Sequence, residues 1–576
     1  MAARFFTAAL ALAGSAAAVA VPKPRATIKE RATSVTMVLP LGTVIGTSSG
    51  GVESYNSIPF AEPPTGSLRL KPPVKKTTSF GVLDGTGPAA ACPQFIESTS
   101  GSFLTEVIGL LADSPFIQKA TGQSEDCLTM DVYRPAGTTA ADKLPVLFWI
   151  FGGGFELGWT SMYDGAGLVA DSIALGKPMV FVAVNYRVGG FGFLPGAEIL
   201  ADGSANLGLL DQRLGLEWTA DNIGYFGGDA SKVTIWGESA GAISVLDQMI
   251  LYDGNITYNG KALFRGAIMD SGSIVPADPV DCPKGQAVYD QVVSKAGCSG
   301  QADTLACLRS ADFTTFLNAV NSVPGILSYS SVALSYLPRP DGTVLTDSPD
   351  VLVEANKYAA VPMIIGDQED EGTLFALFQS NITNTAQLVQ YLSTYFFHDA
   401  TTDQLNALVA TYPDNASAGS PFNTLILNEI YPEFKRLAAI LGDLVFTLTR
   451  RAFLTATYTL NPSVPSWSYL ASYDYGTPIM GTFHGSDLLQ VFYGILPNAA
   501  SKNIHSYYFN FVYNLNPNTA TGGTSSTASK VSLSWPQWGA GNQLVQFYAL
   551  TSNLLADNFR SSSFNWIVDN IPSLHI

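Results

Sequence analysis

Short, fully apolar segments recur along the sequence and constrain its fold more than any other feature. We predict six of them as buried strands: residues 144–151, 179–186, 233–236, 264–269, 361–365 and 467–473. Helical patterns lie between them, and Leu207, Leu210, Leu214 and Trp218 fall on one helical face. Apolar strands that alternate with helices are typical of a mostly parallel sheet covered on both sides. The sequence therefore predicts an α/β fold.

Composition and charge exclude several classes of protein. The 576 residues are 47% hydrophobic and only 13% charged, so intrinsic disorder is excluded. The net charge of −17 repels a phosphate backbone, and we expect no nucleic-acid partner. Beyond the N-terminus no apolar run reaches the ~20 residues of a membrane-spanning helix, so no integral membrane segment is expected.

The N-terminal segment indicates export. Arg4 precedes the apolar residues 5–13 and a series of small residues that ends at Ala20, which is the layout of a cleavable secretory signal. We predict a signal peptide over residues 1–20, with a short membrane anchor as the alternative. Residues 21–35 form a possible pro-segment or linker, and residues 36–576 form a single domain of a secreted, extracellular protein.

Two further features fit an extracellular protein. Asn-x-Ser/Thr triplets predict N-glycosylation at Asn255, Asn381 and Asn415. The five cysteines are an odd number, so at least one has no partner within the chain. Spacing favours a short loop from Cys298 to Cys307 and a longer one from Cys92 to Cys127, which leaves Cys282. Other pairings remain open on spacing alone.

The motif Gly237-Glu238-Ser239-Ala240-Gly241 lies between the strand 233–236 and the apolar helical stretch 242–251. In that context it indicates a nucleophile elbow, a sharp turn that exposes a serine hydroxyl. The alternative is a glycine-rich turn with an incidental serine. A serine nucleophile needs a base, normally a histidine oriented by a carboxylate.

Only four histidines are available as the base. His484 lies in a loop of small residues after the strand 467–473 and is the best candidate. His575 is next to the C-terminus, His398 lies in a predicted helix, and His505 lies in an aromatic stretch. We predict packing or surface roles for His398 and His505.

The orienting carboxylate is expected directly after the strand 361–365, at the end where open α/β sheets build their sites. Four acids stand there: Asp367, Glu369, Asp370 and Glu371. The chain order serine, acid, histidine matches an α/β-hydrolase. The spacing does not choose among the four.

Backbone N–H groups are expected to stabilise the oxyanion of an acyl-transfer intermediate. Residues 152–154 are three consecutive glycines after an apolar strand, and Ala240 follows the serine. Each preorganised donor is worth ~2.7–4 kcal/mol in such sites. The alternative for the glycine run is an ordinary turn.

At these residues the sequence resembles the type-B carboxylesterase/lipase family, and most closely its secreted fungal lipases of the Candida rugosa and Geotrichum candidum kind. The resemblance extends from about residue 38 to near the C-terminus. Its markers include residues 58–64, 124–128, 151–158, 185–187, 226–229, 237–242, 337–342, 370–373 and the His484 loop.

The resemblance implies an α/β-hydrolase fold in which Ser239 is the nucleophile, His484 the general base and acid, and Glu371 the carboxylate. It also implies an oxyanion hole of Gly153, Gly154 and Ala240, disulfides Cys92–Cys127 and Cys298–Cys307, and no metal or cofactor. Residues 92–127 correspond to the mobile lid of the fungal lipases. The apolar lid face, expected to contact substrate, comprises Phe103, Leu104, Val107, Ile108 and Leu111. The alternative is an amphipathic helix fixed to the core.

We therefore predict a serine ester hydrolase, a lipase that acts on long-chain acylglycerols at a lipid–water interface. Apolar Leu374 and Phe375 beside Glu371 are expected to contact the substrate. The alternatives are a carboxylesterase or steryl esterase, a serine peptidase with the same triad, and a non-catalytic cholinesterase-like binding protein. The oligomeric state is left open.

Overall fold

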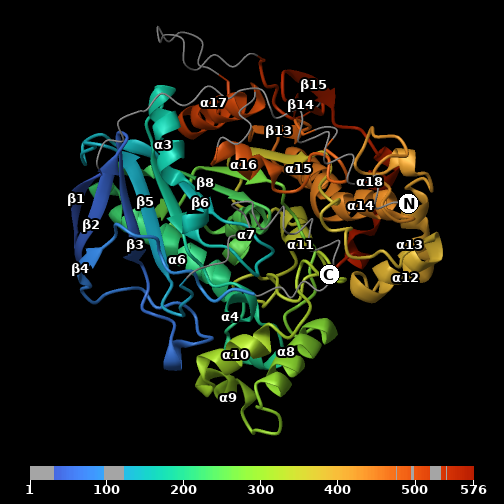
Figure 1. Ribbon diagram of the computed structural model, residues 1–576, viewed down its shortest axis with the longest axis horizontal. Coiled ribbons are helices and arrows are strands. Elements are labelled where there is room, and N and C mark those ends of the chain that lie inside the picture. The colour runs from blue at the N-terminus through green and yellow to red at the C-terminus, as the bar shows by residue number, and fades with distance from the viewer. Residues whose placement is uncertain (1–31, 96–121, 475–476, 494–498, 519–532, 540) are drawn as a thin grey trace, which may run out of the picture.

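The computed structural model describes residues 32–95, 122–474, 477–493, 499–518, 533–539 and 541–576. A large sheet lies at its centre (Figure 1). The strands follow one another across it in the order β1 (Thr33–Leu39), β2 (Gly42–Ser49), β3 (Val52–Pro59), β5 (Thr129–Pro135), β7 (Val180–Val184), β6 (Leu144–Ile150), β8 (Gly228–Glu238), β11 (Gly266–Asp270), β12 (Met363–Gln368), β13 (Ser466–Ala471), β14 (Gln543–Phe547) and β15 (Ser552–Ala556). Strand β4 (Gly81–Asp84) pairs with β2, and β9 (Thr257–Tyr258) and β10 (Lys261–Ala262) form a separate ribbon.

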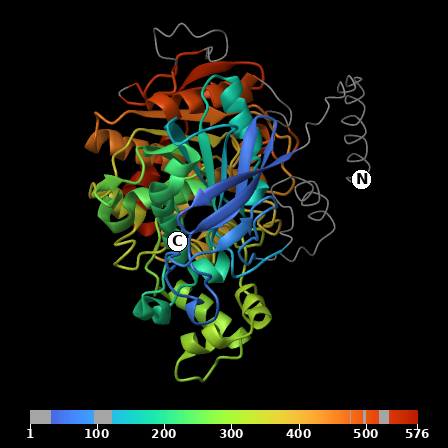
Figure 2. The ribbon, with the colours of Figure 1, turned by 90° about the vertical axis from the view of Figure 1, so that its left-hand side faces the viewer.

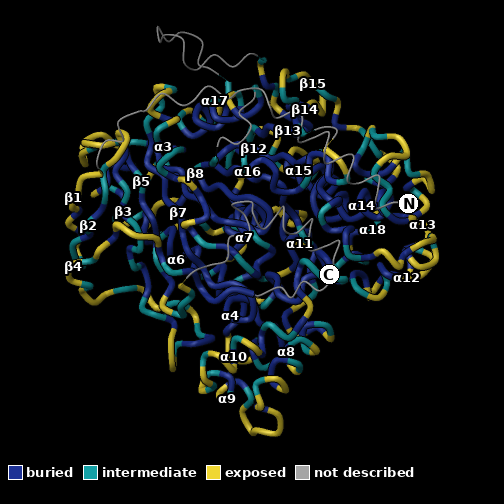
Figure 3. Tube along the Cα trace, in the orientation of Figure 1, coloured by how far each residue is buried: buried dark blue, intermediate teal, exposed yellow. Residues whose placement is uncertain are grey.

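The middle of the sheet is parallel from β7 to β14. All six predicted strands belong to this part, and the predicted α/β fold is confirmed. Residues of β7, β11, β12 and β13 are buried without exception, because helices cover both faces of a parallel sheet. Figure 3 shows this buried centre in dark blue.

The edges of the sheet are antiparallel. Strands β1, β2, β3, β5 and β7 pair in sequence at one edge, and β15 pairs with β14 at the other. Strand β1 alternates between exposed and buried positions towards its end, as expected for a sheet with one solvated face. It begins at Thr33, slightly before the predicted domain boundary at residue 36.

Helices enclose the sheet in two groups. Helices α6 (Leu207–Asn222) and α7 (Ala240–Gly254) pack together and on β8, whereas α3 (Gly165–Ala174) and α17 (Ala499–Asn514) pack together and on strands that include β6 and β7 (Figure 1). Within the described ranges, every helix is too short or too polar to cross a bilayer. The other α-helices of the described residues are α4 (Gly189–Phe193), α5 (Ala197–Asp202), α8 (Pro283–Lys295), α9 (Thr304–Ser310), α10 (Phe313–Val320), α11 (Pro349–Glu354), α12 (Thr385–Tyr395), α13 (Thr402–Ala410), α14 (Phe434–Gly442), α15 (Leu448–Leu460), α16 (Ser486–Val491) and α18 (Ser561–Asn570).

Helices α8, α9 and α10 project together from the body of the molecule (Figures 1 and 2). The disulfide Cys298–Cys307 joins the turn after α8 to α9, and Cys92–Cys127 closes the longer loop. Cys282 is buried and unpaired, and its sulfur accepts a hydrogen bond from Gly285 N at the start of α8. The structure thus contains both disulfides that the resemblance implied.

A buried ion-pair network ties α15 to the sheet. The Arg450 guanidinium lies 2.6 Å from Asp367 at the end of β12 and 2.7 Å from Asp557, and all three side chains are inaccessible to solvent. Removing one partner of such a network leaves uncompensated buried charge. The network therefore holds the end of β12 in place, and it uses Asp367, the first of the four predicted acids, as a structural partner.

Candidate active site

Ser239 occupies a sharp turn between β8 and α7. Its backbone has φ 57° and ψ −127°, a conformation that few residues other than glycine adopt. A Cβ on Gly241 would lie 2.1 Å from the carbonyl oxygen of Ile150, and one on Gly237 would lie 2.3 Å from Gly241. Gly241 is therefore required for the turn to pack against β6, and Gly237 is required for the two sides of the turn to approach each other.

The loops that follow β12 and β13 pair with each other. Asp370 and Phe483 form a parallel bridge in which Asp370 N donates to Thr482 O over 3.0 Å. The Asp370 carboxylate in turn accepts a hydrogen bond from Thr482 N over 3.0 Å. Because Glu371 and His484 directly follow the bridged residues, the pairing brings their side chains together.

The three predicted triad residues form one continuous hydrogen-bonded chain. His484 Nε2 lies 2.7 Å from Ser239 Oγ, and His484 Nδ1 lies 2.5 Å from Glu371 Oε2. The other Glu371 oxygen accepts a hydrogen bond from Gln368 N over 2.7 Å, which fixes the carboxylate. All three side chains are buried. Such a chain can take the proton of a serine hydroxyl on the imidazole and stabilise the resulting imidazolium.

A second buried acid approaches the imidazole. Glu238 Oε1 lies 3.5 Å from His484 Nε2. Burial, reinforced by the nearby carboxylates of Asp487 and Glu371, raises the pKa of Glu238 well above its usual range. Glu238 therefore holds its proton to higher pH than an exposed glutamate.

The glycine run lies opposite the serine. Gly152, Gly153 and Gly154 line the same cavity as Ser239 and His484. Gly153 and Gly154 have φ of 113° and 63°, and a Cβ on Gly153 would lie 2.2 Å from Leu157 O. Ala240 is the first residue of α7, where backbone N–H groups have no intrahelical acceptor. These groups border the space beside the serine hydroxyl.

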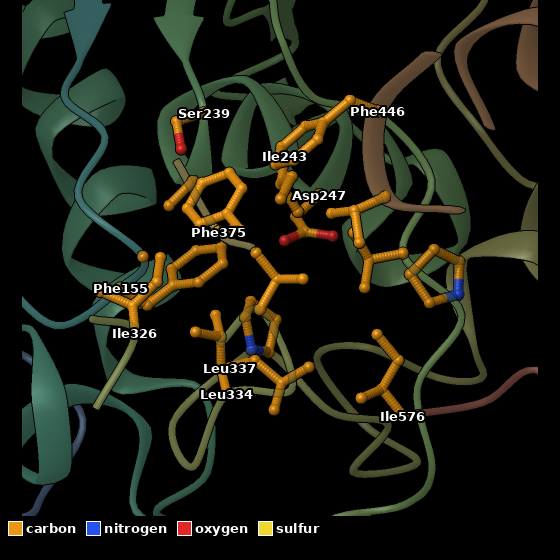
Figure 4. Close-up of a pocket in the computed structure, with 17 residues that line it drawn as sticks. Phe155, Ser239, Ile243, Asp247, Ile326, Leu334, Leu337, Phe375, Phe446 and Ile576 are labelled. Carbon is orange, nitrogen blue, oxygen red and sulfur yellow. The ribbon is translucent and has the colours of Figure 1, made fainter. Parts of the chain in front are cut away.

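Two apolar cavities meet at Ser239. The first, of about 570 Å³, extends along α7 and is walled by Phe375, by residues of the 326–338 segment and by the π-helical turn η6 (Asp443–Thr447) (Figure 4). The second, of about 770 Å³, lies over the glycine run and the His484 loop. Leu374 lines the second cavity, and Phe375 lines both.

Several predicted residues lie elsewhere. The predicted lid residues Phe103, Leu104, Val107, Ile108 and Leu111 fall outside the described residues. Asn255, Asn381 and Asn415 are exposed, so glycosylation there stays a prediction. Of the other histidines, His505 is buried in α17 and His575 lies near Asp350. The predicted helix at His398 is wrong, because α12 ends at Tyr395. In the part of the chain that the structure describes, no cluster of His, Cys, Asp or Glu could hold a metal.

Sequence reasoning missed several residues of the cavity wall. Ile326 is fixed by a hydrogen bond from its N–H to Glu156 over 2.8 Å, and the Phe446 ring lies 4.5 Å from the His484 ring. They come from an irregular segment and a π-helical turn, which carry no periodic signal. Asp247 of α7 was missed because an acid in an apolar helix has no motif.

The parallel sheet with a serine at its sharp strand–helix turn defines an α/β-hydrolase. The sequence pattern of the carboxylesterase family matches residues 32–565. "Secreted lipase 1" of Botryotinia fuckeliana is 61% identical over 553 residues, which cover 95% of each chain. "Secreted triacylglycerol lipase LIP1" of Gibberella zeae is 60% identical over 95% of this chain and 92% of that relative. The crystal structure of Aspergillus niger EstA superposes with a TM-score of 0.78 at 26% identity, covering 94% of this chain and 99% of that one.

The chain belongs to the carboxylesterase family. It is therefore a carboxylic ester hydrolase, as the sequence predicted. Lipases of Diutina rugosa and Geotrichum candidum are also among its relatives, which confirms the resemblance to secreted fungal lipases.

Proposed function

We propose that this protein is a secreted lipase that hydrolyses long-chain acylglycerols through an acyl-enzyme on Ser239. The observation that carries the proposal is the hydrogen-bonded chain Ser239–His484–Glu371 at the junction of two apolar cavities. Residues 1–20 act as its signal peptide, residues 21–35 as a pro-segment or linker, and residues 36–576 as one catalytic domain.

Catalysis takes place in two acyl transfers. Ser239 Oγ attacks the ester carbonyl while His484 Nε2 accepts its proton, and the protonated imidazole then donates that proton to the departing alcohol. Water, deprotonated by the same imidazole, attacks the acyl-enzyme and releases the fatty acid. Glu371 keeps Nδ1 protonated and stabilises the imidazolium.

The oxyanion of each tetrahedral intermediate lies towards the N–H groups of Gly153, Gly154 and Ala240. Donors fixed before the reaction lower the barrier because they need no reorganisation as the charge develops. The absence of side chains on both glycines lets the substrate carbonyl approach the backbone closely.

The cavity along α7 supports an acyl chain as the group bound beside Ser239. Its walls are mostly apolar and include Ile243, Phe375 and Phe446. Two relatives are named as secreted lipases, one of them a triacylglycerol lipase, and those names support the same substrate class and export for this chain.

An exposed apolar loop supports action at a lipid surface. Leu425, Ile426 and Leu427 are 70%, 74% and 66% exposed, respectively. Lys435 Nζ donates to the carbonyl oxygens of Leu425 and Leu427 and so holds the loop in shape. Three consecutive exposed aliphatic side chains are unfavourable in water and favourable in contact with acyl chains.

The test is the hydrolysis rate of tributyrin and triolein, each followed from below to above its solubility limit, with Ser239→Ala as the inactive control. A lipase shows a rise in rate when the interface forms and hydrolyses triolein emulsion. Ordinary saturation with tributyrin below the limit, and no turnover of triolein, would instead indicate a carboxylesterase for soluble esters. Replacing Leu425, Ile426 and Leu427 by serine is expected to lower turnover on emulsion while leaving hydrolysis of dissolved p-nitrophenyl butanoate unchanged.

A further inference from the structure

Asp247 is an acid in the wall of the apolar cavity beside Ser239. Its side chain is 1% exposed, and neither carboxyl oxygen has a hydrogen-bond partner among the described residues. Figure 4 shows its carboxyl group among the apolar side chains of the cavity, such as Ile243 and Phe375. A buried carboxyl without a partner is unfavourable, so its place in this wall points to a polar group on the bound molecule.

The carboxyl group is suited to a neutral hydrogen-bonding partner. Burial alone raises the pKa of Asp247 well above its usual range, because no cation or donor offsets the loss of solvent. In its protonated form the group offers one O–H donor and one carbonyl acceptor. A hydroxyl, which both donates and accepts, complements this pair.

The position of Asp247 along α7 sets its distance from the ester carbonyl that reacts with Ser239. Ala240, Ile243 and Asp247 are spaced three and four residues apart, so they share the face of the helix that lines the cavity. Asp247 lies eight positions after Ser239 in the sequence, which corresponds to about 12 Å along the helix axis. With carbon–carbon bonds of about 1.5 Å and tetrahedral angles, an extended acyl chain covers this distance in roughly ten carbons.

We propose that Asp247 is a specificity-determining residue that selects acyl chains bearing a hydroxyl near the middle of the chain. Its O–H donates to the hydroxyl oxygen and its carbonyl oxygen accepts the hydroxyl proton. The remaining cavity wall packs on the methylenes on either side. This inference rests on the proposed function, in which the cavity along α7 holds the acyl chain.

The test compares kcat/KM for p-nitrophenyl esters of three acids dispersed in the same detergent: octadecanoic, 10-hydroxyoctadecanoic and 16-hydroxyoctadecanoic acid. We expect the 10-hydroxy ester to be favoured over the unsubstituted ester by about tenfold, because one otherwise unpaired buried group gains its partner. The 16-hydroxy ester, whose hydroxyl lies past Asp247, is expected to react no faster than the unsubstituted ester.

Variants test whether the preference for the 10-hydroxy ester depends on the Asp247 side chain. Asp247→Leu is expected to reduce the 10-hydroxy preference to about onefold, whereas Asp247→Asn, which still donates and accepts, is expected to retain most of it. The matched control is Ser244→Ala on the same helix, whose hydroxyl faces Gln212 over 3.0 Å rather than the cavity. Its preference is expected to equal that of the unchanged protein.

Equal kcat/KM for the three esters in an active, unchanged protein would overturn the inference and leave the proposed function intact. A preference that survives in Asp247→Leu would also overturn it. Turnover of none of the three esters, although a fluorophosphonate labels Ser239, would instead overturn the proposed long-chain function. If Asp247→Leu yields no folded protein, Asp247→Asn and the ester series on the unchanged protein still decide the question.

Discussion

The packing of Gly241 against β6 predicts that a single methyl group at this position impairs catalysis. In Gly241→Ala the new Cβ would lie 2.1 Å from the carbonyl oxygen of Ile150, whereas real Cβ contacts are not shorter than 3.0 Å. The start of α7 and the end of β6 must therefore separate by at least about 0.9 Å. No flexible side chain can absorb this shift, because the atom it meets belongs to the backbone.

The shift changes the geometry of the reaction. The end of β6 leads into Gly153 and Gly154, and the start of α7 carries Ser239, so the serine and the glycine N–H groups move apart. A misplacement of about 1 Å lowers turnover by roughly 100-fold. Overpacking also destabilises the protein by about 1–3 kcal/mol, offset by up to about 1 kcal/mol from the better helix propensity of alanine.

The assay is hydrolysis of dissolved p-nitrophenyl butanoate, with active sites counted by a fluorophosphonate so that kcat refers to folded enzyme. Gly224→Ala is the matched control, because a Cβ there meets nothing within 4 Å. We expect its kcat to stay within about twofold of the unchanged protein. A kcat per site within threefold of the unchanged protein for Gly241→Ala would refute the reasoning about the turn.

Three further predictions concern the acid, the buried arginine and the C-terminus. Glu371→Gln is expected to lower kcat by about 10⁴ and Glu369→Gln by less than about threefold, measured on the same ester, because Glu371 contacts the imidazole and Glu369 does not. Arg450→Met takes the arginine away from the buried Asp367 carboxylate and leaves Asp557 with Arg451 alone, and is expected to cost about 3–5 kcal/mol, measured by urea unfolding followed through tryptophan fluorescence. Burial lowers and the Asp350 carboxylate raises the pKa of His575, with a net rise. Because the folded protein binds this proton more tightly than the unfolded chain does, protonated His575 stabilises the fold. The stabilisation is complete below the ordinary histidine pKa and is lost as the pH rises through the raised pKa of the folded protein. The loss of stability in His575→Gln should accordingly be larger at pH 5.5 than at pH 8.5, and equal losses at both would contradict the assignment.

The parallel centre of the sheet was predictable because its strands are buried on both faces. Such strands are continuous apolar runs, and the predicted segments 144–151 and 361–365 correspond to β6 and β12 with small shifts at their ends. The antiparallel edges were not identified. A strand such as β15, whose residues are mostly exposed or half-exposed, has no apolar run to reveal it.

The serine was predictable for a local reason and the cavity was not. The sequence around Ser239 contains the whole of its turn: the strand before it, the glycines within it and the helix after it. The wall residues Ile326, Phe446 and Asp247 meet only after segments far apart in the chain have packed together. The spacing of residues within any one segment therefore does not predict these contacts.

The identity of the triad carboxylate is determined by the folded structure and not by the local sequence. Asp367, Glu369, Asp370 and Glu371 have similar chemistry within five positions, yet the fold gives them different partners. The carboxylate of Asp367 meets a buried arginine, that of Glu369 accepts a hydrogen bond from an asparagine, and that of Asp370 joins the two active-site loops. Only Glu371 follows the bridge that sets the neighbouring loop in register, and so only its carboxylate faces His484. Exchanging the residues at 370 and 371 would preserve composition and pattern but would alter both the loop bridge and the contact with the imidazole. The choice of acid is therefore a property of the pairing between two loops and not of the run that contains it.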